Sequence, residues 1–244
     1  MIKAIFNGRL GNNLYQYALL RILAETKNFK FNVNKGSFHP IRIYPDLYLG
    51  ESTEDNISYQ NFNEGVNKYN PEVFNINDNT CINGYWQSEK YFKGYENIIK
   101  NDWYNLNYDM QNKCVIHFRY QDDYITKNHT PNLSYFKNAI NIVNKHKSNI
   151  EFIVVTDNTH KAKEYFPDFV IKKQSEKLDF KEIYEAKYKI ISNSTFSWWA
   201  SWLTLEKSDL IIAPNRWMNN RYSVLKQDTF YPYDIETEGF TYID

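Results

Sequence analysis

Hydroxyl and indole side chains gather in one late segment of the chain, and their spacing could bind an anion. The segment Asn193–Trp199 reads Asn-Ser-Thr-Phe-Ser-Trp-Trp and follows an apolar run typical of a strand. Asn193 or Ser194 is a favourable first residue for a helix, and the first turn of a helix offers amide groups and a positive dipole end to a pyrophosphate. The alternative is a capped core helix in which Trp198 and Trp202 pack on one face. Three serines share another stripe of the same helix: Ser194, Ser197 and Ser201.

A histidine and an arginine end an apolar run in the middle of the chain. Side chains alternate along a strand, so His117 and Arg119 point to the same face. A guanidinium can bind two phosphate oxygens at once, and an imidazole can accept a proton or organise hydrogen bonds. Two carboxylates follow, Asp122 and Asp123, and either is also a candidate base. The alternative is a surface ion pair between Arg119 and one of them.

A glycine-bounded turn near the start carries two amide side chains. Gly8 and Gly11 suggest a tight turn after a first strand. Asn12 and Gln16, four residues apart, lie on one face of the helix that follows and could exchange hydrogen bonds with a sugar. A buried helix with a polar tip explains the same residues without a ligand.

A second segment of the first half, Asn83–Phe92, combines aromatic rings with a carboxylate. Tyr85 and Trp86 could stack on an acceptor sugar, and Glu89 is a candidate general base. A helix capped by Ser88 is the alternative.

Alternating strands and helices must position these groups. In the second half, strand-like and helix-like runs alternate from Lys113 to Ala213, which indicates a parallel, doubly wound sheet. Ligands of such sheets bind beyond the carboxyl ends of the strands, where the polar clusters 117–123, 156–158 and 193–197 fall. We expect an α/β protein with two lobes, 1–110 and 111–244, and a site in the cleft between them. The first half is predicted to contain a strand at 2–6, a buried helix at 10–24 and a helix at 88–100; no element is placed in 35–80.

The amino-acid composition and net charge exclude several classes of protein. Of the 244 residues 42% are hydrophobic and 24% charged, a globular balance. Basic and acidic residues number 29 each, and this zero net charge argues against a nucleic-acid partner. The only cysteines are Cys81 and Cys114, which favours a reducing compartment. The apolar start is too short for a signal peptide or a membrane span. We therefore expect a cytoplasmic protein, with peripheral membrane association left open.

The motifs that the sequence lacks bear on whether the protein binds a metal ion or a cofactor. The sequence contains no Asp-x-Asp triplet, no Walker loop and no cysteine–histidine metal pattern. We therefore expect neither a metal ion nor another cofactor.

Five segments in order resemble glycosyltransferase family 11, the α-1,2-fucosyltransferases. The family pattern runs roughly G-x-L-G-N-Q-x-x-Q-Y, G-Y-W-Q-S-x-x-Y-F, H-x-R-x-G-D-Y, N-S-T-F-S-W-W and A-P-x-x-W. The matching segments here are Gly8–Tyr17, Gly84–Phe92, His117–Asp123, Asn193–Trp199 and Ala213–Trp217. They span nearly the whole chain, and the fourth is close to identical. The resemblance implies a GT-B-like fold with a Rossmann-like C-terminal lobe, and metal-independent transfer of L-fucose with inversion, from GDP-β-L-fucose to a galactoside-type hydroxyl.

The resemblance also implies roles for residues. It assigns Arg119 to the donor pyrophosphate, the 193–197 turn to the same group, and Asp157 to the nucleotide. The donor-binding residues predicted are Gly11, Asn12, Arg119, Asp157, Asn193, Ser194, Thr195 and Ser197. The acceptor-side residues predicted are Gln16, Tyr85, Trp86 and Gln87. The catalytic candidates are Arg119, His117, Glu89 and Asp122.

The loop after Arg119 departs from the family pattern. Gln121 stands where the family has glycine, Asp123 where it has tyrosine, and Tyr120 where a second arginine is frequent. Two other functions therefore stay open: a related transferase with a different nucleotide-sugar donor, and a catalytically silent module that binds a sugar or nucleotide.

Overall fold

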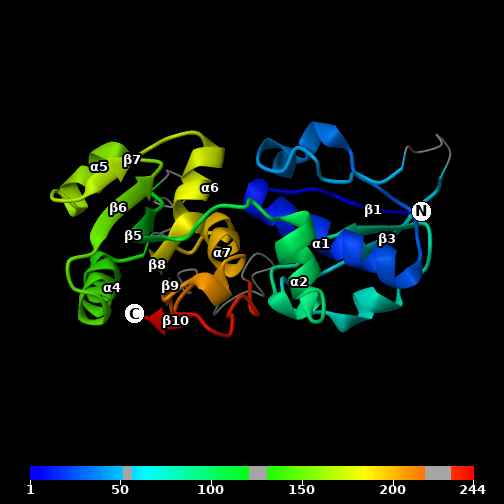
Figure 1. The fold of residues 1–244 in the computed structure, drawn as a ribbon. Coiled ribbons are helices and arrows are strands. Elements are labelled where there is room, and N and C mark those ends of the chain that lie inside the picture. The colour runs from blue at the N-terminus through cyan, green and yellow to red at the C-terminus, as the bar shows by residue number, and fades with distance from the viewer. Residues whose placement is uncertain (52–56, 121–130, 218–231) are drawn as a thin grey trace. The chain divides into compact units, whose positions relative to one another are not determined.

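The chain forms two compact α/β units. The computed structural model describes residues 1–51, 57–120, 131–217 and 232–244 (Figure 1). Within these ranges, one unit consists of residues 1–105 with 232–236, and the other of 106–217 with 237–244. The division therefore falls before the limit expected at 110, and a late segment belongs with the first unit. Tyr233 explains this return, because its amide donates to the Asn67 carbonyl at 3.0 Å.

The first unit is built on a four-stranded parallel sheet in the order β2-β1-β4-β3. Its strands are short: β1 Ile2–Ala4, β2 Phe31–Asn32, β3 Gln60–Asn63 and β4 Thr80–Asn83. Single 3₁₀ turns at 35–37, 39–42 and 71–75 connect them.

Helix α1, Leu10–Lys27, is buried on nearly every side, as its apolar sequence predicts. Tyr15 stacks on Phe92 with ring centroids 5.7 Å apart, and Tyr17 meets Trp103 edge-on at 6.3 Å. These contacts pin α1 between the sheet and the aromatic segment near residue 100. No helix among the described residues is long and apolar enough to cross a membrane.

The prediction of a single helix at 88–100 is wrong. A 3₁₀ turn at Glu89–Phe92 is followed by the short helix α2, Glu96–Ile98, and a π-helical turn at Ile99–Trp103. Gly94 separates them because its φ of +85° lies in the left-handed region, which breaks a right-handed helix.

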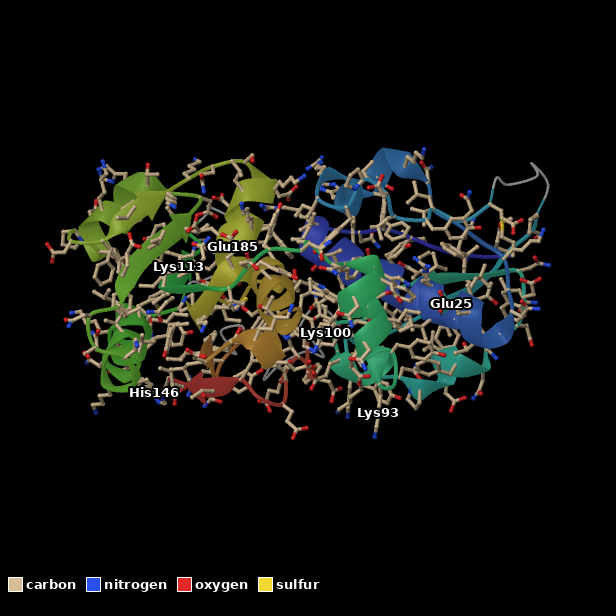
Figure 2. The ribbon with its side chains drawn as sticks, in the orientation of Figure 1. Glu25, Lys93, Lys100, Lys113, His146 and Glu185 are labelled. Atoms are coloured by element: carbon tan, nitrogen blue, oxygen red, sulfur yellow. The ribbon has the colours of Figure 1, made fainter. Side chains whose placement is uncertain are left out.

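The second unit holds a six-stranded parallel sheet in the order β10-β9-β8-β5-β6-β7. The strands are β5 Gln111–Phe118, β6 Glu151–Thr156, β7 Val170–Lys172, β8 Ala186–Ile190, β9 Leu210–Pro214 and β10 Thr241–Ile243. The helices are α4 Leu133–His146, α5 Thr159–Tyr165, α6 Glu176–Glu185 and α7 Thr195–Trp202. The last turn of α4 carries Lys145 and His146, which suits the negative end of its dipole (Figure 2). Two parallel sheets in two units confirm the α/β, GT-B-like class expected from the sequence.

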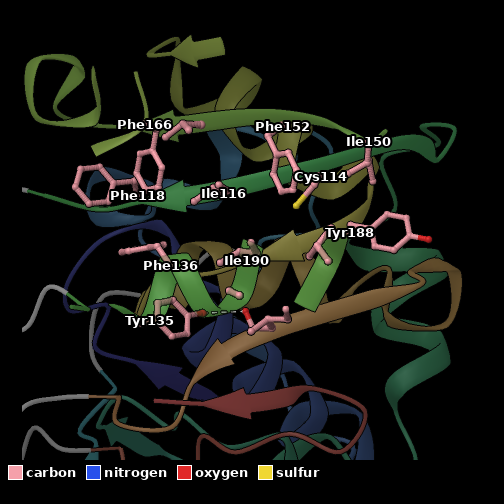
Figure 3. Packing of buried hydrophobic residues seen from close by; sticks show 14 of the residues in the cluster. Cys114, Ile116, Phe118, Tyr135, Phe136, Ile150, Phe152, Phe166, Tyr188 and Ile190 are labelled. Carbon is pink, nitrogen blue, oxygen red and sulfur yellow. Dashed lines mark hydrogen bonds between the residues drawn. The ribbon is translucent and has the colours of Figure 1, made fainter. Parts of the chain in front are cut away.

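Alternation along β5 separates a core face from a polar face. Cys114, Ile116 and Phe118 enter the apolar cluster beneath α4 and α5 (Figure 3). Lys113 and His117 therefore point the other way, toward α6 and α7. The strand register thus decides which side chains reach α7.

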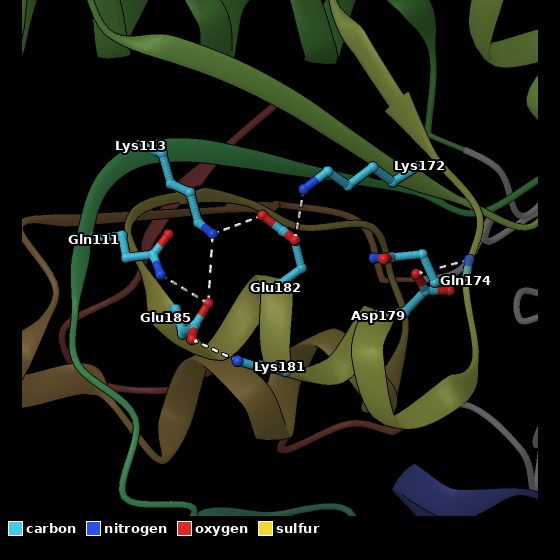
Figure 4. A network of polar contacts seen from close by, with 8 residues as sticks. All are labelled: Gln111, Lys113, Lys172, Gln174, Asp179, Lys181, Glu182 and Glu185. Carbon is cyan, nitrogen blue, oxygen red and sulfur yellow. Dashed lines mark hydrogen bonds and ion pairs between the residues drawn. The ribbon is translucent and has the colours of Figure 1, made fainter.

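An ion-pair network fastens α6 to the start of β5. The Lys113 ammonium lies 2.6 Å from Glu182, and Lys172 on β7 lies 2.9 Å from the same carboxylate (Figure 4). Burial alone would raise the pKa of Glu182, but hydrogen bonds from the two lysines hold it below its ordinary value. Glu185 adds contacts to Lys113 and Lys181. The network thus ties α6 to both β5 and β7.

A buried lysine on β8 makes the stability of the second unit depend on pH. Lys189 has no exposed surface and donates to Thr204 and Ser208 at 2.8 and 2.6 Å. Burial lowers the pKa of Lys189 to about 7. Above pH 7 the unfolded chain therefore binds the proton that the folded chain has released, so the free energy of unfolding rises with pH. Urea unfolding at pH 7, 8 and 9 should show this rise for the wild type and a smaller rise for Lys189→Met; parallel profiles would contradict it.

Candidate functional site

The second sheet reverses its winding between β5 and β8. From β5 the chain adds β6 and β7 on one side, and β8, β9 and β10 lie on the other. Such a switch point leaves a crevice beyond the carboxyl ends of the two strands, where α/β proteins bind ligands. Arg119 follows β5 at this point, and the Asn193–Ser197 turn follows β8.

One serine hydroxyl ties these two strand ends together. Ser192 donates to the His117 carbonyl at 2.6 Å and accepts from the Arg119 amide at 3.2 Å. On the other side, the Tyr120 amide donates to the Asp157 carboxylate, just beyond β6, at 2.7 Å. The backbone around Arg119 is therefore anchored to both neighbouring strands. The sequence-predicted residues Arg119, Asp157 and Asn193 lie at adjacent strand ends.

His117 is a buried neutral side chain. It is 7% exposed, and its ring lies 5.8 Å from that of Phe196 in the first turn of α7. Burial first, and then the charge of Arg119, lower the pKa of His117 to about 3. The imidazole is therefore a weak proton acceptor, and of the two roles left open by the sequence its burial favours the organising of hydrogen bonds. Its Nδ1 has no hydrogen-bond partner among the described residues.

The start of α7 is a hydrogen-bonded turn whose N-cap side chain makes no capping hydrogen bond. Asn193 donates to the Trp217 carbonyl at 2.5 Å, and the Ser194 amide donates to the Ser192 carbonyl at 2.7 Å. Ser194 occupies the N-cap position, but its side chain makes no capping hydrogen bond. The positive end of the helix dipole is thus not neutralised by its own cap.

The Ser197 hydroxyl is part of this turn's interior. It has no exposed surface and donates to the Ser194 carbonyl at 3.1 Å. Since the hydroxyl is used inside the protein, only the backbone amide of Ser197 suits the donor-binding role predicted for it. Thr195 is partly exposed in the same turn and keeps its predicted role as an expectation.

The first sheet has a switch point of its own, between β1 and β4. Asn12, in the first turn of α1, accepts a hydrogen bond from Gln87 at 2.8 Å, and Gln87 accepts one from Asn67 at 3.0 Å. Gly11 is buried in the same first turn. Amide side chains from three segments therefore meet here.

Gln16 does not reach this surface. Its side chain has no exposed area; it accepts from the Asn7 amide and Asn13 at 3.2 and 3.1 Å, and donates to the Gly84 carbonyl at 2.8 Å. These hydrogen bonds tie the loops after β1 and β4 to α1, so the structure does not favour the acceptor contact predicted for Gln16, which stays a prediction.

The structure does not favour the predicted stacking of Trp86 on a sugar, which also stays a prediction. Its indole is fully buried, stacked on Phe62 at 6.3 Å and edge-on to Tyr91 at 5.6 Å. Tyr85 is partly exposed, so its ring keeps the role predicted for it. Glu89 opens the 3₁₀ turn after Ser88, and its side chain is partly exposed.

Two predicted carboxylates, Asp122 and Asp123, lie outside the described residues. Within the described ranges, no group of three histidine, cysteine or acidic side chains could hold a metal ion.

Sequence reasoning missed two residues that shape the sites. Ser192 is not among the residues singled out from the sequence, although its hydroxyl joins the ends of β5 and β8. Glu64 lies in a segment without clear periodicity, and only its contacts with the loop after β4 reveal it.

Comparison with known proteins places the chain among sugar-transferring enzymes. The sequence model of Glycosyl transferase family 11 matches residues 1–236. An α-1,2-colitosyltransferase of Escherichia coli is 22% identical over 268 aligned residues, which cover 89% of this chain and 92% of that protein. The O-antigen biosynthesis glycosyltransferase WbnK of Escherichia coli is 24% identical, covering 64% of this chain and 61% of that protein. Among solved structures, NodZ α-1,6-fucosyltransferase soaked with GDP-fucose aligns over 82% of this chain and 92% of that one, with 14% identity and a TM-score of 0.45.

Proposed function

Since the chain belongs to glycosyl transferase family 11, we propose that it transfers L-fucose from GDP-β-L-fucose to a hydroxyl of a galactoside-type acceptor in glycan biosynthesis. The acceptor oxygen attacks C1 of the fucose as the bond from C1 to the phosphate oxygen breaks. GDP leaves with the electron pair of that bond, the hydroxyl proton passes to a base, and the configuration at C1 inverts. The difficult part of this step is the negative charge that develops on the β-phosphate.

The observation that supports this proposal is the anchored Arg119 beside an uncapped helix start. Ser192 fixes the Arg119 backbone next to the turn that opens α7. A guanidinium and first-turn amides both stabilise phosphate oxygens, and preorganised donors act on charge as it develops. In this account Arg119 binds the pyrophosphate, and the amides of residues 195–197 complete the site.

His117 and Asp157 support the donor site in different ways. A neutral His117 beside Arg119 adds no positive charge that would repel the guanidinium. Asp157 holds the Tyr120 amide and lies beyond β6, where the nucleotide is expected. For the base we retain Glu89 and Asp122 as candidates, since His117 is a poor proton acceptor.

The second candidate function is transfer of a colitosyl group, or of another sugar, by the same chemistry. It is favoured by the colitosyltransferase relative, which is similar over most of both chains. A silent binding module is the third. Incubation with GDP-fucose and with GDP-colitose, each with and without a β-galactoside, separates them: GDP release from one donor identifies the transferred sugar, and no release from either donor with retained GDP binding supports the silent module.

A panel of nucleotides tests the donor class directly. We expect GDP to raise Tm by several degrees, because a ligand at about 100 times its Kd stabilises a folded protein by about 2.7 kcal/mol. ADP, UDP and CDP at equal concentration should raise it less. A larger shift with UDP than with GDP would contradict the guanine nucleotide as the donor carrier.

A further inference from the structure

A buried carboxylate outside the predicted set holds the loop after β4. Glu64 follows β3, is 7% exposed, and donates its own amide to the Asn83 carbonyl at 2.9 Å. Its Oε2 accepts from the Tyr85 amide at 2.7 Å and from the Trp86 amide at 3.1 Å, and its Oε1 accepts from the same Trp86 amide at 3.1 Å. One side chain therefore fixes two successive peptide groups of the loop.

The loop needs such an anchor because its backbone is strained. Trp86 has a φ of +58°, in the left-handed region. Among the described residues, the other non-glycine residues with positive φ are all asparagines, which tolerate this conformation. A bulky residue persists there only where its surroundings enforce it.

Gly84 shows that the fit around Glu64 is close. A Cβ at Gly84 would lie 2.5 Å from the Glu64 Cβ and 2.7 Å from Oε2. Only a residue without a side chain lets the carboxylate approach the loop.

The anchored loop leads directly into the amide cluster of the first unit. Gln87, the residue after Trp86, donates to Asn12 at 2.8 Å, and the Gly84 carbonyl accepts from Gln16 at 2.8 Å. Gln87 is itself buried, whereas Tyr85, another expected acceptor contact, is partly exposed, and the positions of both depend on the Glu64 hydrogen bonds.

Resting on the proposed function, we propose that Glu64 is a positioning residue of the acceptor subsite: its carboxylate holds the Gly84–Gln87 loop in its strained form and thereby sets the partly exposed Tyr85 against the acceptor sugar. Glu64 itself touches no substrate in this account. Loss of its charge should weaken acceptor binding and leave donor binding unchanged.

The protonation of Glu64 gives a readout that a merely structural residue would not give. Burial raises the pKa of Glu64 to about 7, although the two loop amides counteract it. The ionised form accepts both amides with full charge, so the loop should loosen as pH falls through 7. Tyr91 interacts electrostatically with the Glu64 carboxylate, and also with Tyr69 and Asp234. Asp234 in turn forms an ion pair with Lys90 and interacts with Lys68. Burial holds the pKa of Tyr91 far above neutral, and that of Asp234 lies below its ordinary value, so neither titrates near pH 7.

The test compares Glu64→Gln with Glu72→Gln, a control on an exposed glutamate of the same unit. GDP-fucose and lactose serve as donor and acceptor probes. We expect Glu64→Gln to raise the acceptor KM about tenfold, the effect of losing a charged hydrogen bond, with the donor KM within about twofold of the control. The wild-type acceptor KM should rise below pH 7, and that rise should be absent from Glu64→Gln.

Gly84→Ala supplies an independent perturbation of the same contact without changing a charge. It should raise the acceptor KM as well, and the double variant should be no worse than about the worse single variant, because both changes disrupt one contact. Additive effects would overturn the shared role.

Hydrogen exchange at residues 84–88 tests the loop without any acceptor. We expect faster exchange of the Tyr85 and Trp86 amides in Glu64→Gln than in Glu72→Gln. Equal exchange and equal acceptor KM in the two variants overturn the proposal, as does an equal rise of both KM values with a lowered Tm. The wild type could transfer no sugar to any acceptor while Glu64→Gln still speeds amide exchange in the loop. That result would overturn the proposed function and leave the structural role of Glu64 in the loop standing.

Discussion

Arg119→Ala should lower kcat by a factor of about 10²–10³ while the protein stays folded. A preorganised donor to developing charge contributes about 3–4 kcal/mol to catalysis, and Arg119 places a guanidinium at the switch point between β5 and β8. Its backbone hydrogen bond to Ser192 does not depend on the side chain, so the truncation leaves the strand ends anchored. The measurement is GDP release from GDP-fucose in the presence of acceptor, with Tm recorded for each protein.

The control for Arg119→Ala is Arg42→Ala, which removes an exposed arginine of the first unit. It should transfer sugar at nearly the wild-type rate. If folded Arg119→Ala transferred sugar at a rate near that of Arg42→Ala, the proposal that Arg119 binds the pyrophosphate would be contradicted.

Trp198→Ala should cost about 3–5 kcal/mol of unfolding free energy, as expected for truncation of a large buried aromatic side chain. Trp198 has no exposed surface, stacks on Trp202 at 5.7 Å and donates its indole N–H to Thr237 at 2.9 Å. Its truncation leaves a cavity and removes the hydrogen bond that Trp198 donates to the Thr237 hydroxyl. Urea unfolding followed by circular dichroism measures the change.

Trp198→Phe separates packing from the hydrogen bond. It keeps an aromatic ring in place and should lose less stability than Trp198→Ala. A loss below about 0.5 kcal/mol for Trp198→Ala, the range of surface substitutions, would contradict the view that the packing of α7 supports its first turn.

The second unit was largely predictable from the sequence because its strands are continuous apolar runs. β5, β6 and β9 each carry buried β-branched or aromatic side chains, and polar residues follow them at the strand ends. Strand β10 was not predicted, since Thr241–Ile243 is too short to show a pattern.

The first unit was less predictable because its sheet is built from very short strands. The two-residue β2 shows no alternation, and β3 reads Gln-Asn-Phe-Asn with mostly exposed side chains. Hydrophobic periodicity cannot identify such strands.

The site residues also differ in how far the sequence predicts their positions. The positions of Arg119 and Asn193 follow from strand ends, which the sequence marks clearly. Whether an amide or indole faces inward does not follow from residue type, and so Gln16 and Trp86 were assigned to the surface although both are buried. The Glu64 contact joins segments about twenty positions apart, and only the folded chain brings them together.

Titration calorimetry of GDP and GMP with the wild type and Arg119→Ala tests most directly whether the β5–β8 switch point binds the diphosphate. We expect the wild type to bind GDP at least about tenfold more tightly than GMP, since a charged hydrogen bond to the β-phosphate is worth about 1.5–3 kcal/mol, and we expect Arg119→Ala to lose most of this preference. Equal affinities of the wild type for GDP and GMP, or an unchanged preference in Arg119→Ala, would contradict it.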